Sequence, residues 1–272
     1  MLALRLARVP IGAIRAFEPF LAFTPLLSVA ILRARGIGAP DGKRPGPIRL
    51  HMRGTSWRRY LFALMLFPAL GAAALAFRWA GEGRLPVFAS RPWSSWLIDS
   101  LTLFVLPGVA EEPGWRGWLQ HELRARRSVF TSSVLVGLVW GVWHARDRVL
   151  HPGRFEQAGL AWFFVLIVAA SVVIGWIFDW TSESLLAAMT AHFGANAVFH
   201  FLPIFVGDER GTARIYTALV CGAALVLGAI GGVGRRSPPE ARSTAENRPG
   251  GDSSEKSAEL SPILSHPGQE PP

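Results

Sequence analysis

The stretch AGLAWFFVLIVAASVVIGWIF, residues 158–178, decides the fold class of this chain, because it is almost wholly apolar and carries no charged residue. A helix that crosses the hydrocarbon core of a bilayer needs about 20 such residues, whereas buried helices of soluble domains are usually shorter and polar along one face. Runs of low charge recur along the chain, with the charged residues crowded between them. This pattern predicts a multi-pass membrane protein.

The gaps between charged residues define the expected helices. Candidate spans are residues 14–33, 60–77, 93–110, 128–143, 158–178, 184–207 and 215–234. Residues 111–127 have a helical composition with many polar groups, and we expect Pro107 and Gly108 to break the helix that precedes them. Backbone polar groups in lipid must be satisfied internally, and the ten-residue alternation of a β-barrel is missing. The predicted fold class is all-α, a polytopic transmembrane bundle of about seven or eight helices.

The chain divides into three parts by composition. Residues 1–13 are basic and weakly amphipathic, which suggests an interfacial segment, and residues 14–234 form the expected membrane-embedded domain. Residues 235–272 are rich in Ser, Pro, Glu and Gly, so we expect a disordered polar tail. Eight Lys and Arg residues lie between residues 33 and 59, which places this loop on the cytoplasmic side of the inner (plasma) membrane.

Charge and cysteine content exclude several classes of protein. The net charge of +9 comes from Lys and Arg in short loops, and no basic face interleaved with aromatics is present, so a nucleic-acid partner is not expected. The single cysteine, Cys221, allows no intrachain disulfide and no thiolate metal cluster. A transporter of the inverted-repeat type would show internal symmetry, which the sequence lacks.

The sequence EEPGWRG, residues 111–117, places charged groups between apolar runs. Pro113 suits the first turn of a new helix, and the dipole of that helix favours two carboxylates at its start. Glu112 and Arg116 are four residues apart and are expected to pair, which leaves Glu111 without an obvious local partner and suited to act as a base. The alternative is a capped interfacial helix with solvated charges.

Two further groups place histidines in apolar runs. WGVWH ends at His144, and HFGAN runs from His192 to Asn196, whose four-residue spacing puts both side chains on one helical face. Ionisable groups inside spans are costly and mark function by default. Their alternative roles are an aromatic belt with an interfacial histidine and simple hydrogen bonding between helices.

A hairpin would bring the first two groups to the same depth in the membrane. If residues 110–126 and 129–146 run antiparallel and turn near Arg127, then Glu111 and His144 each lie about 25 Å from the turn at ~1.5 Å per residue. A third helix carrying His192 and Asn196 would complete one polar cluster. The sequence therefore predicts that these four side chains converge within the membrane.

With these three motifs the chain resembles the CPBP family, which contains type II CAAX prenyl endopeptidases and bacteriocin-processing or self-immunity membrane proteins. The family's pattern is Glu-Glu-x-x-x-Arg, then aromatic-x-x-x-His, then His-x-x-x-Asn. The corresponding residues here are Glu111, Glu112 and Arg116; Trp140 and His144; and His192 and Asn196. Trp140 stands where Phe is usual, and the flanking sequences look like those of bacterial members.

The resemblance implies an intramembrane endopeptidase that cleaves a membrane-associated protein or peptide in contact with membrane lipid, without a metal or other cofactor. It implies that Glu111 activates a water molecule, that His144 positions this water, and that His192 and Asn196 bind the oxyanion. Glu112 and Arg116 would hold the structure of the site.

Two alternatives stay open at the level of sequence. One Glu and two His could instead bind zinc, although no His-Glu-x-x-His motif is present. The chain could also be a non-catalytic membrane immunity or scaffold protein.

Overall fold

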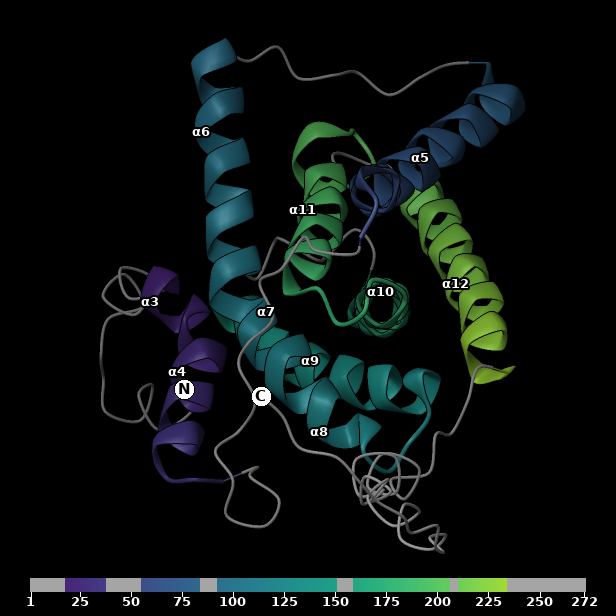
Figure 1. Ribbon diagram of the computed structural model, residues 1–272. Coiled ribbons are helices and arrows are strands. Elements are labelled where there is room, and N and C mark those ends of the chain that lie inside the picture. Colours follow the sequence, from purple (N-terminus) through teal and green to yellow (C-terminus); the bar gives the residue numbers. More distant parts are fainter. Residues whose placement is uncertain (1–17, 38–54, 84–91, 151–158, 206–209, 234–272) are drawn as a thin grey trace, which may run out of the picture. The chain divides into compact units, whose positions relative to one another are not determined.

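The computed structural model describes residues 18–37, 55–83, 92–150, 159–205 and 210–233 (Figure 1). Every regular element in these ranges is a helix, which confirms the predicted all-α class. The expected interfacial segment at residues 1–13 and the expected disordered tail at residues 235–272 lie outside the described residues.

The described residues form twelve helical segments. In order, they are α3 (Glu18–Ala22), α4 (Thr24–Ala34), α5 (Trp57–Glu82), α6 (Trp93–Leu103), η2 (Phe104–Val109), α7 (Ala110–Gly114), η3 (Trp115–Gln120), α8 (His121–Arg124), α9 (Val129–Leu150), α10 (Leu160–Trp180), α11 (Leu185–Phe201) and α12 (Arg210–Val233).

Four stretches of helix in the described part of the chain are long and apolar enough to cross a membrane, judged by length and composition. They are Trp57–Glu82, Trp93–Arg124, Leu160–Trp180 and Gly211–Ile230. Shorter apolar helices cover Thr24–Ala34 and Val129–Ala145. A bilayer core requires about 20 apolar residues of helix, and these lengths are those of an integral membrane protein.

The helix break predicted at Pro107 and Gly108 is wrong. One continuous helix runs from Trp93 to Arg124, and two of its segments, η2 and η3, are π-helical. In an α-helix a proline ring clashes with the carbonyl four residues back, and the wider π turn around Pro107 accommodates the ring instead. Glu111 and Glu112 therefore lie mid-helix between two π segments, so a free helix N-terminus does not explain why two carboxylates occur here.

Helix α10 supplies more of the buried hydrophobic residues than any other helix in the described part of the chain. Figure 1 shows it end-on, and it packs against α9, α11 and α12. Its contact with α9 is close at Gly137, where an added Cβ would lie 2.9 Å from the Cα of Val168. The outer faces of α9 and α12 are apolar and exposed, as expected for surfaces that face lipid. These exposed residues include Leu138, Val139, Val142, Leu225, Val226 and Ile230.

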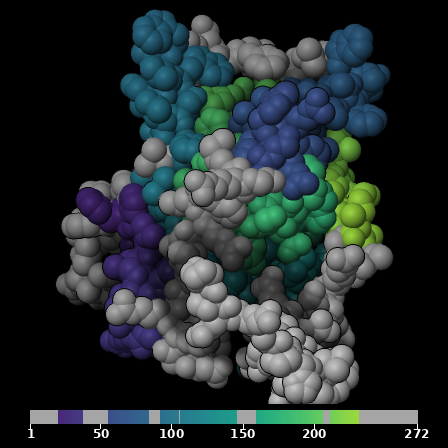
Figure 2. All heavy atoms as spheres, in the orientation of Figure 1, coloured from purple at the N-terminus to yellow at the C-terminus, as the bar shows by residue number. Residues whose placement is uncertain are grey.

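Helix α11 packs on α5, and both lie on the face of the molecule shown in Figure 2. Gly194 allows this approach, because a Cβ there would lie 2.5 Å from the carbonyl oxygen of Leu64. The helix begins after Ser184, whose hydroxyl accepts a hydrogen bond from the Ala187 N–H. It ends at Phe201, earlier than the predicted residue 207, because Leu202 precedes Pro203 and takes the extended conformation.

Candidate active site

Two adjacent carboxylates lie at the centre of the site on the short helix α7. Glu112 is completely buried and Glu111 is 5% exposed. Neighbouring residues on a helix point in directions about 100° apart, so the two carboxylates meet different partners.

The Glu112 carboxylate joins α7 to α11. Its Oε1 atom accepts a hydrogen bond from Nη1 of Arg116 at 2.9 Å and lies 2.7 Å from Nδ1 of His192. The pair with Arg116, predicted from the four-residue spacing, is present, and the contact with His192 was not predicted. Because an ionised carboxylate can only accept hydrogen bonds, we assign the proton of this contact to Nδ1 of His192.

The Glu111 carboxylate is held by two tryptophans. Nε1 of Trp140 donates to its Oε2 atom at 2.9 Å, and Nε1 of Trp115 donates to the same oxygen at 3.3 Å. The expectation that Glu111 lacks a local partner is therefore wrong, since Trp115 stands four residues further along the same helix. The contact with Trp140 comes from α9 and could not be read from local spacing.

The Trp140 indole, which bonds Glu111, also contacts both side chains that bond Glu112. The guanidinium carbon of Arg116 is 5.1 Å from the centre of this ring, and the His192 ring meets it edge-on with centroids 5.0 Å apart. Glu111 and His192 thus both contact the Trp140 indole. The Nδ1 atom of His192 lies against the other carboxylate, that of Glu112.

His144 and Asn196 line a cavity of about 150 Å³ beside this cluster. Trp140 also lines the cavity, so the same indole borders both the cavity and the buried carboxylates. The remaining walls come from α5, α10, α11 and α12. Residues that form these walls include Phe67, Phe163, Leu166, Phe199 and Tyr216. Trp140 thus contacts Glu111, His144 and His192, and it lines the cavity that His144 and Asn196 share.

A layer of buried polar groups supports Arg116. Its Nη2 donates to the Ser171 hydroxyl at 3.3 Å, and that hydroxyl donates to the carbonyl of Ser133 at 2.8 Å. One turn further along η3, Gln120 donates to the carbonyl of Gly175 at 3.1 Å. The sequence analysis missed these residues, although residues 116 and 120 share one helical face and Ser171 and Gly175 form a small-x-x-x-small pair typical of membrane helix contacts.

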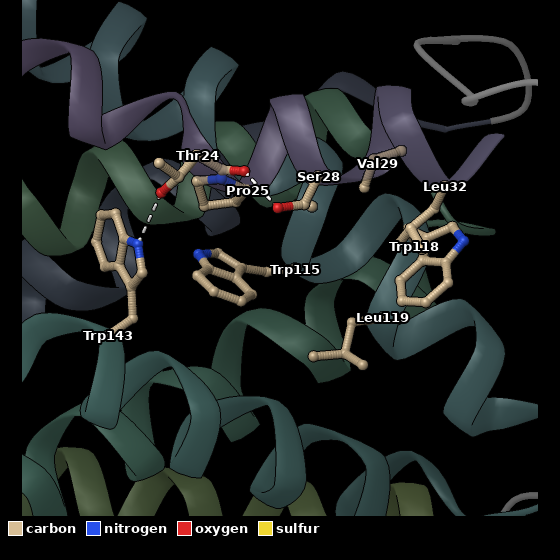
Figure 3. Close-up of a pocket in the computed structure, with 10 residues that line it drawn as sticks. Thr24, Pro25, Ser28, Val29, Leu32, Trp115, Trp118, Leu119 and Trp143 are labelled. Carbon is tan, nitrogen blue, oxygen red and sulfur yellow. Dashed lines mark hydrogen bonds between the residues drawn. The ribbon is translucent and has the colours of Figure 1, made fainter. Parts of the chain in front are cut away.

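On its other side, Trp115 lines a groove between α4 and η3 (Figure 3). The groove also measures about 150 Å³ and is mostly apolar. Trp143 forms a second wall, and its Nε1 donates to the Thr24 hydroxyl at 3.0 Å. Helix α4 lies directly on α7 here, since a Cβ on Gly114 would meet Pro25 at 2.5 Å.

Within the part of the chain that the structure describes, no group of three or more His, Cys, Asp or Glu side chains is arranged to hold a metal ion. The polar groups that the structure brings together at the site are carboxylates, imidazoles, an amide and indole N–H groups. This set can accept a proton, donate hydrogen bonds to a developing negative charge and return a proton.

Fold and site together define an integral membrane protein with a buried acid–base cluster inside a helical bundle. Residues 93–198, which hold all three motifs, match the family described as type II CAAX prenyl endopeptidase Rce1-like. The chain is also 27% identical over 143 residues to CAAX prenyl protease 2 of Methanococcus maripaludis. That match covers 50% of this chain and 49% of the relative, so it spans about half of each protein. Residues 93–198 are thus similar to type II CAAX prenyl endopeptidases, in agreement with the resemblance of the three motifs to the CPBP family.

Proposed function

We propose that this protein is an intramembrane endopeptidase that hydrolyses a peptide bond of a membrane-associated protein or peptide, with Glu111 as the general base. The observation that carries the proposal is the position of Glu111. Its carboxylate is buried within a membrane helix, where ionisable groups are costly, and two neutral indole N–H groups donate hydrogen bonds to it. A buried carboxylate whose orientation is fixed by hydrogen bonds can act as a general base toward a bound water.

The proposed reaction is direct attack by water. The scissile carbonyl enters the cavity beside His144 and Asn196, and a water molecule lies between the carbonyl carbon and Glu111. Glu111 takes one proton as the water oxygen bonds to that carbon, and the carbonyl electrons move to its oxygen. When these electrons return, the carbon–nitrogen bond breaks and Glu111 gives its proton to the leaving amine. His144 would orient the water, and the Asn196 amide would donate to the oxyanion.

The contact with Glu112 refines the role of His192. Because Nδ1 of His192 lies against Glu112, Nε2 is the ring nitrogen that remains to face the oxyanion. Glu112 thereby orients the imidazole toward the reacting carbonyl.

The relative's name suggests the first substrate to test. It is called a CAAX prenyl protease, so the first probe is a fluorogenic peptide that ends in a prenylated cysteine followed by two aliphatic residues and one more. A pool of membrane-protein peptides, read by mass spectrometry, is the second probe. We place the protein in the plasma membrane with lipid and the membrane-associated substrate as its partners, and we propose no cofactor.

The experiment compares the purified protein with Glu111→Gln on both probes. Cleavage by the protein and loss of cleavage in the variant support the proposal. No cleavage of either probe would favour a non-catalytic membrane protein. Stoichiometric zinc in the purified protein, together with loss of cleavage on chelation, would favour a metalloprotease.

A further inference from the structure

We propose that Trp140 is a positioning residue that fixes Oε2 of Glu111 through its indole N–H and so leaves Oε1 as the oxygen that takes the proton from water. This inference rests on the proposed function, because it assigns the two oxygens of the same general base.

The hydrogen bonds of the Glu111 carboxylate are asymmetric. Both indole donors, Trp140 at 2.9 Å and Trp115 at 3.3 Å, meet Oε2. Within the described residues, no side chain hydrogen bonds to Oε1. A carboxylate held by one oxygen keeps its orientation while its other oxygen stays available, which is the geometry that a general base needs.

The Trp140 indole is itself fixed by its surroundings. It is 4% exposed, the Arg116 guanidinium lies over its ring, and the rings of His192 and His144 pack at centroid distances of 5.0 and 5.6 Å. Its N–H therefore points to Glu111 from a rigid position. The family that the chain resembles usually has Phe at the position of Trp140. A Phe ring fills a similar space but has no N–H group to donate.

The inference predicts a change in the pH dependence of the reaction. A hydrogen bond from an indole N–H stabilises the ionised form of Glu111, which is the form that acts as a base. Without this bond the carboxylate binds a proton more readily, so activity is lost at a higher pH than in the parent protein. One hydrogen bond to a charged group corresponds to a shift of about one pH unit.

The test is the pH profile of kcat/KM for the full-length Trp140→Phe variant on the fluorogenic prenylated peptide. We expect the acidic limb to move up by about one pH unit, and a smaller move in the same direction for Trp115→Phe, which removes the longer bond. Trp143→Phe is the matched control. It is on the same helix and also loses an indole donor, but that donor bonds Thr24, so its acidic limb should coincide with that of the parent protein.

Failure of this inference can be separated from failure of the proposed function. If Glu111→Gln is inactive while the pH profiles of Trp140→Phe and the parent protein coincide, the positioning role of Trp140 is wrong and Glu111 is still supported as the general base. If Glu111→Gln is fully active, both the proposed function and the assignment of the two Glu111 oxygens are wrong.

A measurement that needs no substrate covers the case in which Trp140→Phe does not fold or no probe is cleaved. In protein labelled with ¹⁵N-tryptophan, Glu111→Gln should shift two of the eleven indole N–H resonances. The Trp143 resonance, identified by its loss in Trp143→Phe, should stay in place. Two shifted resonances support the contacts, and a spectrum in which no indole resonance moves would overturn the inference.

Discussion

Nδ1 of His192 lies 2.7 Å from Oε1 of Glu112, the same oxygen that accepts the hydrogen bond from Arg116. Glu112 therefore orients an imidazole on a helix 80 residues further along the chain, in addition to pairing with its neighbour. In the proposed reaction, the second carboxylate of the Glu-Glu pair therefore acts through His192.

For Glu112→Gln we predict a lower melting temperature, because Arg116 loses its buried ion-pair partner. The folded protein should also show a partial loss of activity, roughly 10- to 100-fold in kcat, because a hydrogen bond to a charged partner contributes about 1.5–3 kcal/mol. The loss should be smaller than that of Glu111→Gln, since Glu112 does not meet the water. Initial rates at pH 7 measure the effect, with Glu122→Gln on the same continuous helix as the charge-matched control. A Glu112→Gln variant with the kcat of the parent protein would show that Glu112 does not orient His192.

Replacing Arg116 with Ala should destabilise the fold strongly. Arg116 and Glu112 are both completely buried, and removing one partner leaves a buried charge uncompensated, at a cost of about 3–5 kcal/mol. Thermal unfolding in detergent and the yield of folded protein measure the effect. Arg124→Ala is the control, because its ion pair with Asp179 is partly exposed and should contribute about 0–1 kcal/mol. Equal melting temperatures for the two variants would contradict the role of Arg116.

Asn196→Ala should lower kcat by about 10²–10³-fold, the usual loss when one oxyanion donor is removed, while the melting temperature changes little. The structural basis is that Asn196 lines the cavity that also holds His144. Thr190→Ala is the control on the same helix, since the Thr190 hydroxyl bonds the carbonyl of Leu186 within that helix. If the two alanine variants have equal kcat values, Asn196 is not an oxyanion donor.

Gly194→Ala should destabilise the contact between α5 and α11. The new Cβ would lie 2.5 Å from the Leu64 carbonyl oxygen, and backbone on both sides must move, at a cost of about 1–3 kcal/mol. Gly222→Ala on α12 meets no atom within 4 Å and should be neutral or stabilise the helix by up to about 1 kcal/mol. Thermal melts of both variants test the contact, and a Gly194→Ala variant as stable as the parent would refute the close packing of these helices.

Composition and local spacing account for the parts of the fold that depend on neighbours in sequence. The apolar run at residues 158–178 predicts α10 to within two residues at each end, and the spacing of Glu112 and Arg116 predicts their ion pair. The helix break at Pro107 was expected from the behaviour of proline in α-helices. It is absent because a π turn, which the sequence does not encode in any simple pattern, accommodates the ring.

The contacts that define the site depend on how helices pack. The bond from Trp140 to Glu111 joins residues 29 apart, the His192–Glu112 contact joins residues 80 apart, and Arg116 reaches Ser171 over 55 residues. The order of the motifs predicts that their Glu, His and Asn side chains share one site. It does not predict which histidine contacts which carboxylate. The hairpin predicted from the sequence puts His144 at the same depth as Glu111, whereas the side chain on α9 that bonds Glu111 is Trp140, one turn earlier.

The central claim is that Glu111 is the general base, and the rate of peptide cleavage by Glu111→Gln tests it most directly. The amide is nearly isosteric and keeps the buried contacts with both indoles, but it cannot accept a proton from water at neutral pH. We predict a melting temperature close to that of the parent protein and a loss of at least about 10²–10⁴-fold in kcat on the fluorogenic prenylated peptide or on the peptides cleaved from the pool. A folded Glu111→Gln variant that cleaves at the rate of the parent protein would contradict the account.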